Sequence, residues 1–295
     1  MKRIEKIISS IQTILGFLSL LGLSFSFYFL ESIRPKMIRF ETITAVEESR
    51  INIFGITLIL LIAFSLVSLY KIVQYLKKVK KISFYDLVLL SLAILSFLFV
   101  FGDLALISDI GKQHKHGLAQ PEWFVLYLVL GFQFLSSAIL TYAGLFRLRK
   151  KVKNEPVATD INIYILVQYV GAVCGFLGLS FTILNFGFPR PLWMIKTHIT
   201  ATSIFLLIPY LLVVLFWFIV KIKEKPKQWY DEKQMQEMGR SSLFTLLSSV
   251  IVVSFLFVLN FNSLEQLLSV LWFPFYIFLT LFLFCGANLW FSFKD

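Results

Sequence analysis

Acidic side chains are the first place to look for chemistry in this very apolar sequence. A carboxylate deep in a hydrophobic helix is costly and usually marks a path for ions, protons or substrate. Asp86, Asp103, Asp109 and Glu122 all lie at or near the ends of the predicted helices. The helix interiors are therefore almost uncharged, which argues against a proton-driven antiporter. The main interior polar groups are amides, which we expect to hydrogen-bond across helices: Gln133, Gln168 and Asn288.

Histidines could build a metal site, but their setting is unfavourable. His114 and His116 lie close to Asp103 and Asp109, which permits a zinc site on paper. The neighbouring lysines repel cations, so a solvated loop is the preferred interpretation. The sequence also has no zinc-spaced cysteine pair, no nucleophile motif and no glycine-rich phosphate loop. We expect no metal, no cofactor and no enzymatic activity.

Two arginines flanked by proline could hold an anion. Arg190 lies in a segment that breaks a hydrophobic stretch and is followed by Trp193, and Arg34 has a similar setting in the first half of the chain. A guanidinium group can bind phosphate or carboxylate with two hydrogen bonds. The hypothesis is a clamp in which Arg34, Arg190 and Trp193 bind an anionic ligand. The simpler alternative is that the arginines reach lipid phosphates while Trp193 is an interfacial anchor.

The polar segment from 229 to 240 is predicted to form a helix at the cytoplasmic membrane surface. Trp229 and Tyr230 would anchor it, Asp231 is a plausible N-cap, and Glu232 suits the first turn. Such an element either fixes topology or provides a contact surface for a cytoplasmic partner.

The same segment carries a local resemblance. Tyr230-Asp231-Glu232-Lys233-Gln234, with Gly239 and Thr245, resembles an Asp-Glu-Arg-Gln segment that precedes a membrane helix in uncharacterised multi-pass proteins of low-GC Gram-positive bacteria. The match covers about twenty residues, and Lys233 stands where those proteins usually have arginine. It implies a multi-pass membrane protein and no particular activity.

Three glycines mark a close helix contact. Gly171, Gly175 and Gly178 are spaced by four and then three residues, which puts them on one face of a helix. Small residues let helix backbones approach closely in a membrane, so we expect a packing seam. A groove for a lipid tail is the functional alternative.

The elements that must position these residues are predicted membrane helices. Of the 295 residues, 58% are hydrophobic and 15% charged, and the mean hydropathy is +0.81. A bilayer crossing needs about 20 apolar residues, and eight such stretches occur. The predicted fold class is an all-α integral membrane protein with about eight transmembrane helices. The stretches are 7–30, 51–72, 85–106, 123–146, 161–188, 199–222, 243–261 and 267–291.

The net charge is +11, and the distribution of the basic residues along the chain indicates membrane topology rather than nucleic-acid binding. Of the 28 Lys and Arg residues, 20 lie in the loops and termini on the side of the N-terminus. By the positive-inside rule that side is cytoplasmic. We therefore expect a multi-pass protein of the cell membrane with both termini cytoplasmic, in contact with membrane lipids and not with nucleic acid.

A weak internal repeat divides the chain. The segment 34–45 aligns without gaps on 190–201, and Phe84-Tyr85-Asp86 corresponds to Trp229-Tyr230-Asp231. Two four-helix units would have the same orientation in the membrane. We predict two parallel four-helix lobes, 1–155 and 156–295, with chance similarity as the alternative.

Two functions are compatible with these observations. The first is a permease, or an accessory transport component, for a hydrophobic or amphiphilic substrate; it would work with a separate ATPase or other protein, or by facilitation. The second is a non-transporting regulatory or scaffold protein that binds a cytoplasmic partner through its basic loops.

Overall fold

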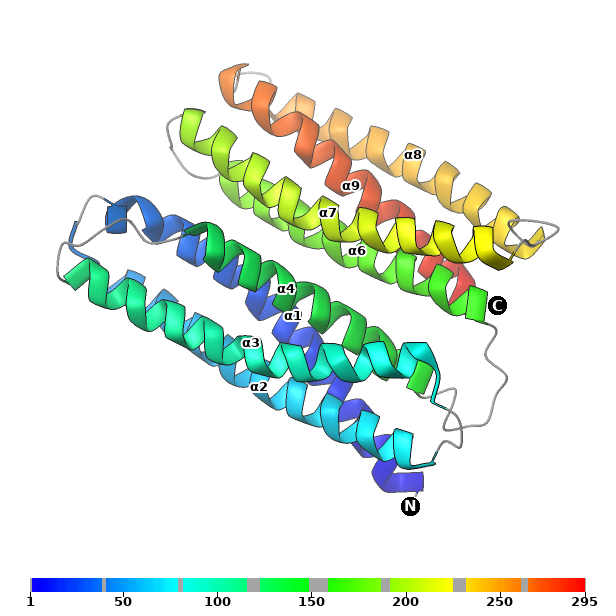
Figure 1. Cartoon of the computed structure of the whole chain (residues 1–295). Coiled ribbons are helices and arrows are strands. Elements are labelled where there is room, and N and C mark those ends of the chain that lie inside the picture. The colour runs from blue at the N-terminus through cyan, green and yellow to red at the C-terminus, as the bar shows by residue number, and fades with distance from the viewer. Residues whose placement is uncertain are drawn as a thin grey trace. The chain divides into compact units, whose positions relative to one another are not determined.

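The described part of the chain is helical except for the short connecting residues 41–44 and 82–83. The computed structural model describes residues 2–38, 41–78, 82–115, 123–148, 159–186, 192–224, 232–260 and 265–294. The helices are α1 (Lys2–Ile38), α2 (Ala45–Lys78), α3 (Phe84–Lys115), α4 (Trp123–Tyr142), the π-helical turn η1 (Ala143–Arg147), α6 (Thr159–Phe186), α7 (Leu192–Glu224), α8 (Glu232–Asn260) and α9 (Glu265–Lys294) (Figure 1).

Eight of these helical segments are long and apolar enough to cross a membrane. They correspond one to one to the eight predicted stretches, and no strand occurs among the described residues. The fold class predicted from the sequence is therefore confirmed. The chain is an all-α, multi-pass membrane protein.

The helices extend beyond the apolar stretches because their ends carry polar caps. Before α2, Thr44 N and Oγ1 both donate to Glu47 Oε2 at 2.9 Å, and before α3 Ser83 N and Oγ donate to Asp86 Oδ2 at 3.0 and 2.8 Å. These reciprocal contacts satisfy backbone N–H groups that a helix start leaves without partners.

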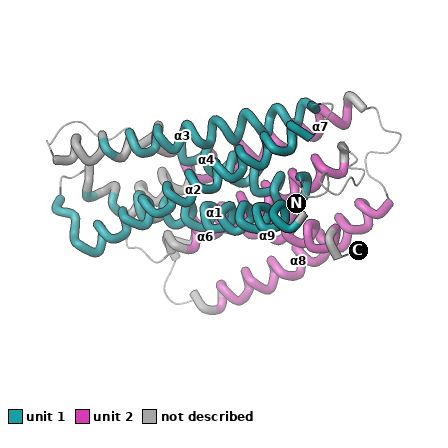
Figure 2. The backbone as a smooth tube through the Cα atoms, turned by 90° about the horizontal axis from the view of Figure 1, so that it is seen from below, with its two compact units in different colours: residues 1–157 teal, residues 158–295 magenta. Residues whose placement is uncertain are grey.

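The chain forms two compact units, Met1–Val157 and Ala158–Asp295 (Figure 2). In the first unit, α1 packs on α2, α2 on α3, α3 on α4 and α4 on α1, which closes a four-helix ring. Successive helices run antiparallel (Figure 1): along α1, Gln12 contacts Ser68 and Ser26 contacts the earlier residue Thr57 of α2.

The second unit is more open. Its most extensive contact joins α6 to α9, and α7 packs on α6 while α8 packs on α9. No comparable contact joins α7 to α8 among the described residues. This gap in the ring is the structural basis of the groove described below.

The predicted internal repeat remains a prediction. Ile43 and Thr44 precede α2, whereas the residues aligned with them, Ile199 and Thr200, lie within α7. The two aligned segments therefore have different local structures, and the two units also differ in which helices pack together.

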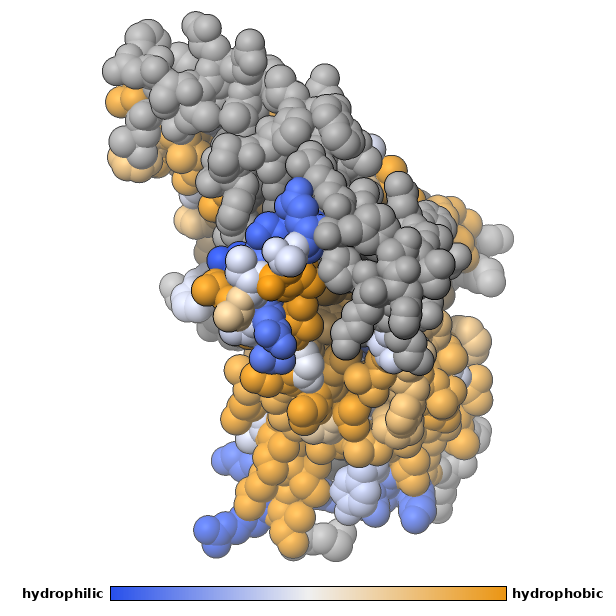
Figure 3. All heavy atoms as spheres, turned by 90° about the vertical axis from the view of Figure 1, so that its left-hand side faces the viewer, coloured by the Kyte–Doolittle hydropathy of each residue, from blue (hydrophilic) through white to orange (hydrophobic). Residues whose placement is uncertain are grey.

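The outer faces of the helices are apolar. On α1, Ile4, Ile7, Ile11 and Ile14 are all more than two-fifths exposed, whereas Gln12 on the same helix is fully buried. Hydrophobic side chains cover much of the described surface in Figure 3. A surface of this kind is suited to lipid and not to water.

Candidate functional site

The predicted arginine clamp is only partly within the described structure. Arg34 lies inside α1 rather than in a connecting segment, because α1 continues through Pro35 to Ile38. Trp193 lies in the first turn of α7, and Arg190 lies outside the described residues. The anion-binding role of Arg34, Arg190 and Trp193 remains a hypothesis.

The polar segment before the seventh membrane span is one continuous helix with that span. Trp229, Tyr230 and Asp231 lie outside the described residues, and exposed Glu232 is the first residue of α8, which runs without a break to Asn260. The helix predicted here therefore continues directly into the membrane span, and its position at the membrane surface stays a prediction.

The start of α8 is attached to the end of α9. Buried Glu237 accepts a hydrogen bond from Ser292 Oγ at 2.8 Å and lies 3.9 Å from Lys233 Nζ. Lys233, Gln236 and Arg240 are exposed beside this contact. This leaves a short, charged face open to a partner.

The three glycines of α6 face α9. A Cβ atom on Gly175 would lie 2.5 Å from the backbone nitrogen of Phe282 and 2.7 Å from its Cα. A Cβ on Gly171 would overlap the Cys285 sulfur, and one on Gly178 would overlap the Phe278 ring. The backbones of the two helices therefore meet along this face.

A groove lies between α7, α8 and α9, in the open side of the second unit. Its volume is about 560 Å³, within the range of small-molecule sites. All twelve lining residues belong to membrane-spanning segments, so the groove lies at the depth of the bilayer. They are Leu207, Tyr210, Leu211, Ser242, Thr245, Leu246, Ser249, Tyr276, Ile277, Thr280, Leu281 and Phe284.

The groove is uncharged, and half of its lining residues carry a hydroxyl group. Ser242 and Thr245 donate their hydroxyl protons to the carbonyls of Met238 and Ser241, one turn earlier in α8, and Thr280 donates to the Tyr276 carbonyl. Each oxygen retains lone pairs that can accept a hydrogen bond. The groove therefore combines apolar walls with hydrogen-bond acceptors.

The first unit has a polar interior arranged in layers. Near the N-terminus of α1, Gln12 Nε2 donates to Ser68 Oγ at 2.9 Å, and further along Ser26 and Thr57 form a 3.5 Å contact. Between them, Ser96 Oγ donates to Gln133 Oε1 at 3.0 Å and is also joined to Ser65 at 3.2 Å. Gln133 thus hydrogen-bonds across helices, as expected from the sequence.

Several groups in this interior have no hydrogen-bond partner among the described residues. They are Gln12 Oε1, the hydroxyls of Ser19, Ser136 and Ser137, and both carboxyl oxygens of Asp103. Buried polar groups are normally satisfied by protein or by ordered water. The interior of this four-helix ring therefore offers sites for water or a small ligand.

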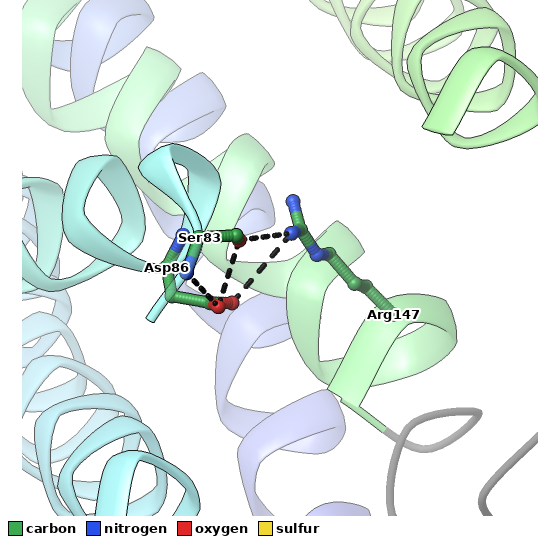
Figure 4. A network of polar contacts seen from close by, with 3 residues as sticks. All are labelled: Ser83, Asp86 and Arg147. Carbon is green, nitrogen blue, oxygen red and sulfur yellow. Dashed lines mark hydrogen bonds and ion pairs between the residues drawn. The ribbon is translucent and has the colours of Figure 1, made fainter. Parts of the chain in front are cut away.

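A buried ion pair lies at the end of this interior where α3 begins (Figure 4). Arg147, the last residue of η1, places Nη2 3.6 Å from Asp86 Oδ1 and donates to Ser83 Oγ at 3.2 Å. Its Cζ lies 4.5 Å from the centre of the Tyr85 ring. The side chains of Arg147 and Asp86 are only 10% and 1% exposed, so the charges are shielded from water.

Asp103 corrects the expectation that all acids lie at helix ends. It is fully buried and lies twelve residues before the end of α3 at Lys115. The apolar span ends at Ala105, near the predicted end at Leu106, but α3 continues through the more polar residues that follow. The first unit therefore does contain an ionisable group among its packed helices.

The sequence of α3 contains a pattern that indicates the buried positions of Asp86 and Asp103. The buried residues recur at alternating intervals of three and four, which is the spacing of one helix face, and an acid stands at each end of the series. If this face had been treated as a unit, both acids would have been predicted to lie in the interior. The residues of the face are Asp86, Leu89, Ala93, Ser96, Val100 and Asp103.

Comparison with protein-family models, with curated proteins and with solved structures finds no match to this chain. The function of the chain is therefore inferred from the geometry of each of its two units.

Proposed function

We propose that the chain is a transport component of the membrane that takes up an uncharged or weakly polar amphiphile from the bilayer. The observation that carries the proposal is the groove of the second unit, which is uncharged, partly hydroxylated and placed within the membrane-spanning segments. An amphiphile with hydroxyl or amide groups matches this lining, because its apolar part packs on leucine and phenylalanine while its donors find acceptor oxygens.

The groove also explains why such a substrate would enter from the side. Leu211 and Leu246 line it and are more than half exposed, so the groove is continuous with the lipid-facing surface. A substrate dissolved in the bilayer would reach the site without crossing water. The proposal includes no catalytic step, and the energy source would be a separate ATPase or the substrate gradient.

Filling the groove is expected to abolish this binding. Leu246→Trp adds bulk at a lining position, and we expect labelling by a photoactivatable diacylglycerol analogue to fall about tenfold, equivalent to ~1.4 kcal/mol of binding free energy. The matched control is Leu247→Trp, because Leu247 has the same exposed fraction, 57%, and does not line the groove. Equal labelling of both variants in reconstituted liposomes would count against the groove as a substrate site.

The second candidate function is a scaffold that binds a cytoplasmic protein. The exposed residues Lys233, Gln236 and Arg240 at the start of α8, beside Met235, which is 64% exposed, favour it. A protein that co-purifies in equal amount with the native chain, and is lost when Lys233 and Arg240 are changed to glutamate, would favour this function over transport.

For the orientation in the cell membrane we propose that both termini are cytoplasmic, supported by the distribution of Lys and Arg. Reporter fusions at Lys115 and at Lys151 are expected to give opposite signals, external and cytoplasmic, because one membrane span separates the two positions. The same signal from both fusions would contradict this topology.

A further inference from the structure

Asp103 is the one buried carboxylate of the described structure that lacks a full hydrogen bond. Its side chain is fully buried, and neither oxygen takes part in a hydrogen bond. The side-chain amide of Gln133 lies beside it and interacts with the carboxyl group, although the contact does not have the geometry of a full hydrogen bond. The described residues therefore enclose the carboxyl group without fully satisfying it.

The surroundings of Asp103 contain no described charge that could neutralise it. Packing partners of α3 are α2 and α4. From α4 the neighbour is Gln133, and the antiparallel pairing of Ser65 with Ser96 puts Thr57 and Leu58 of α2 at the level of Asp103. All of these are uncharged. The buried ion pair of Asp86 and Arg147 is about 25 Å away along α3, by the rise of 1.5 Å per residue.

Neither charge state of Asp103 is satisfied by the described protein atoms alone. An ionised carboxylate would be a buried charge without a described counter-charge, which is strongly unfavourable. A neutral acid would have only the Gln133 amide beside it, without a well-formed hydrogen bond. The described residues therefore leave room for a further partner of this carboxyl group.

We propose that Asp103 is the binding residue for a monovalent cation inside the first unit. One positive charge balances the single carboxylate, and hard oxygen ligands suit such an ion. The amide of Gln133, which lies beside Asp103, offers a neutral oxygen for the same ion, and water would complete its coordination. The ion is either sodium or a proton carried with water; both supply the same single charge. This site is separate from the groove of the second unit and does not depend on the proposed substrate.

The test measures the thermal stability of the full chain in neutral detergent micelles. Sodium is exchanged for N-methylglucamine at constant ionic strength in one series, and in the other the pH is varied without sodium. A cation that binds the folded protein raises its midpoint temperature in a saturable way. For the wild type we expect a rise of about 5 °C in one of the two series, which corresponds to ligand well above its dissociation constant.

The variants separate a specific site from a general salt effect. Asp103→Asn has the same shape without the charge and is expected to lose the response, whereas Asp103→Glu should retain it. Ser136→Ala removes a buried, unpartnered hydroxyl of α4 without changing charge and should respond like the wild type.

The two series identify the ion. A sodium response that Asp103→Asn removes identifies sodium. A rise in stability as the pH falls, again removed by Asp103→Asn, identifies the proton, because a proton held only by the folded form stabilises it at low pH. If the wild type and Asp103→Asn respond alike in both series, Asp103 is not a cation site. Loss of the groove's labelling by Leu246→Trp would leave this result unaffected.

Discussion

Replacing Arg147 by methionine is expected to lower the free energy of unfolding by about 3–5 kcal/mol, the range found when one partner of a buried ion pair is removed. Methionine keeps much of the side-chain length and removes the guanidinium group. Asp86 is only 1% exposed and would lose the Arg147 guanidinium group. Ser83 N and Oγ, which also donate hydrogen bonds to Asp86, carry no positive charge. Detergent-induced unfolding in mixed micelles measures the change.

Two further variants test whether the charge is responsible. Changing Asp86 to leucine in the Arg147→Met background removes both charges, and most of the lost stability should return. Lys78→Met disrupts the pair between Lys78 and Glu5, whose side chains are 47% and 28% exposed, and should cost less than about 1 kcal/mol. If Arg147→Met unfolds at the wild-type detergent concentration, the buried pair does not stabilise the first unit.

Adding a single methyl group at Gly175 is the second large effect. A Cβ atom there would lie 2.5 Å from the backbone nitrogen of Phe282, which cannot rotate away as a side chain could. The helices α6 and α9 must move apart, and overpacking of this kind costs about 1–3 kcal/mol. We expect Gly175→Ala to lower the free energy of unfolding of the second unit by that amount, measured in the same mixed micelles.

Gly286→Ala is the matched control on α9. Nothing lies within 4 Å of a Cβ atom at this position, and alanine favours the helix by about 0.5–1 kcal/mol over glycine. It should therefore be neutral or stabilising. A Gly175→Ala variant as stable as this control would show that α6 and α9 do not pack as closely as described.

The membrane spans could be predicted from the sequence because their signal is local. Each apolar stretch is long enough to identify a helix by itself, and all eight stretches correspond to helical spans. The helix ends are less readable. The first predicted stretch ends at residue 30, yet α1 continues through Pro35 to Ile38, because a proline near a helix end removes only one backbone hydrogen bond.

The sites were less predictable because they depend on which helices meet. The series from Asp86 to Asp103 has helix spacing that is visible in the sequence, but only the pairing of Ser96 with Gln133 and Ser65 shows that this face points inward. The groove has no sequence signature at all. Its serines and threonines are ordinary for membrane helices, and the groove exists because α7 and α8 make no extensive contact with each other among the described residues.

The π-helical turn η1 has a consequence for how the ion pair can be released. A π-turn contains one residue more than an α-turn, so Arg147 is displaced by one helical position, about 100° around the axis, relative to an uninterrupted α-helix. The extra residue also leaves the Gly144 carbonyl facing Ser9 Oγ, at 3.4 Å, on α1. Conversion of η1 into an ordinary α-helical turn would rotate the guanidinium group away from Asp86 without unwinding the helix. The pair of Asp86 and Arg147 therefore depends on the helical register at η1. A shift of register by one residue would separate the N-terminal cap of α3 from the end of α4.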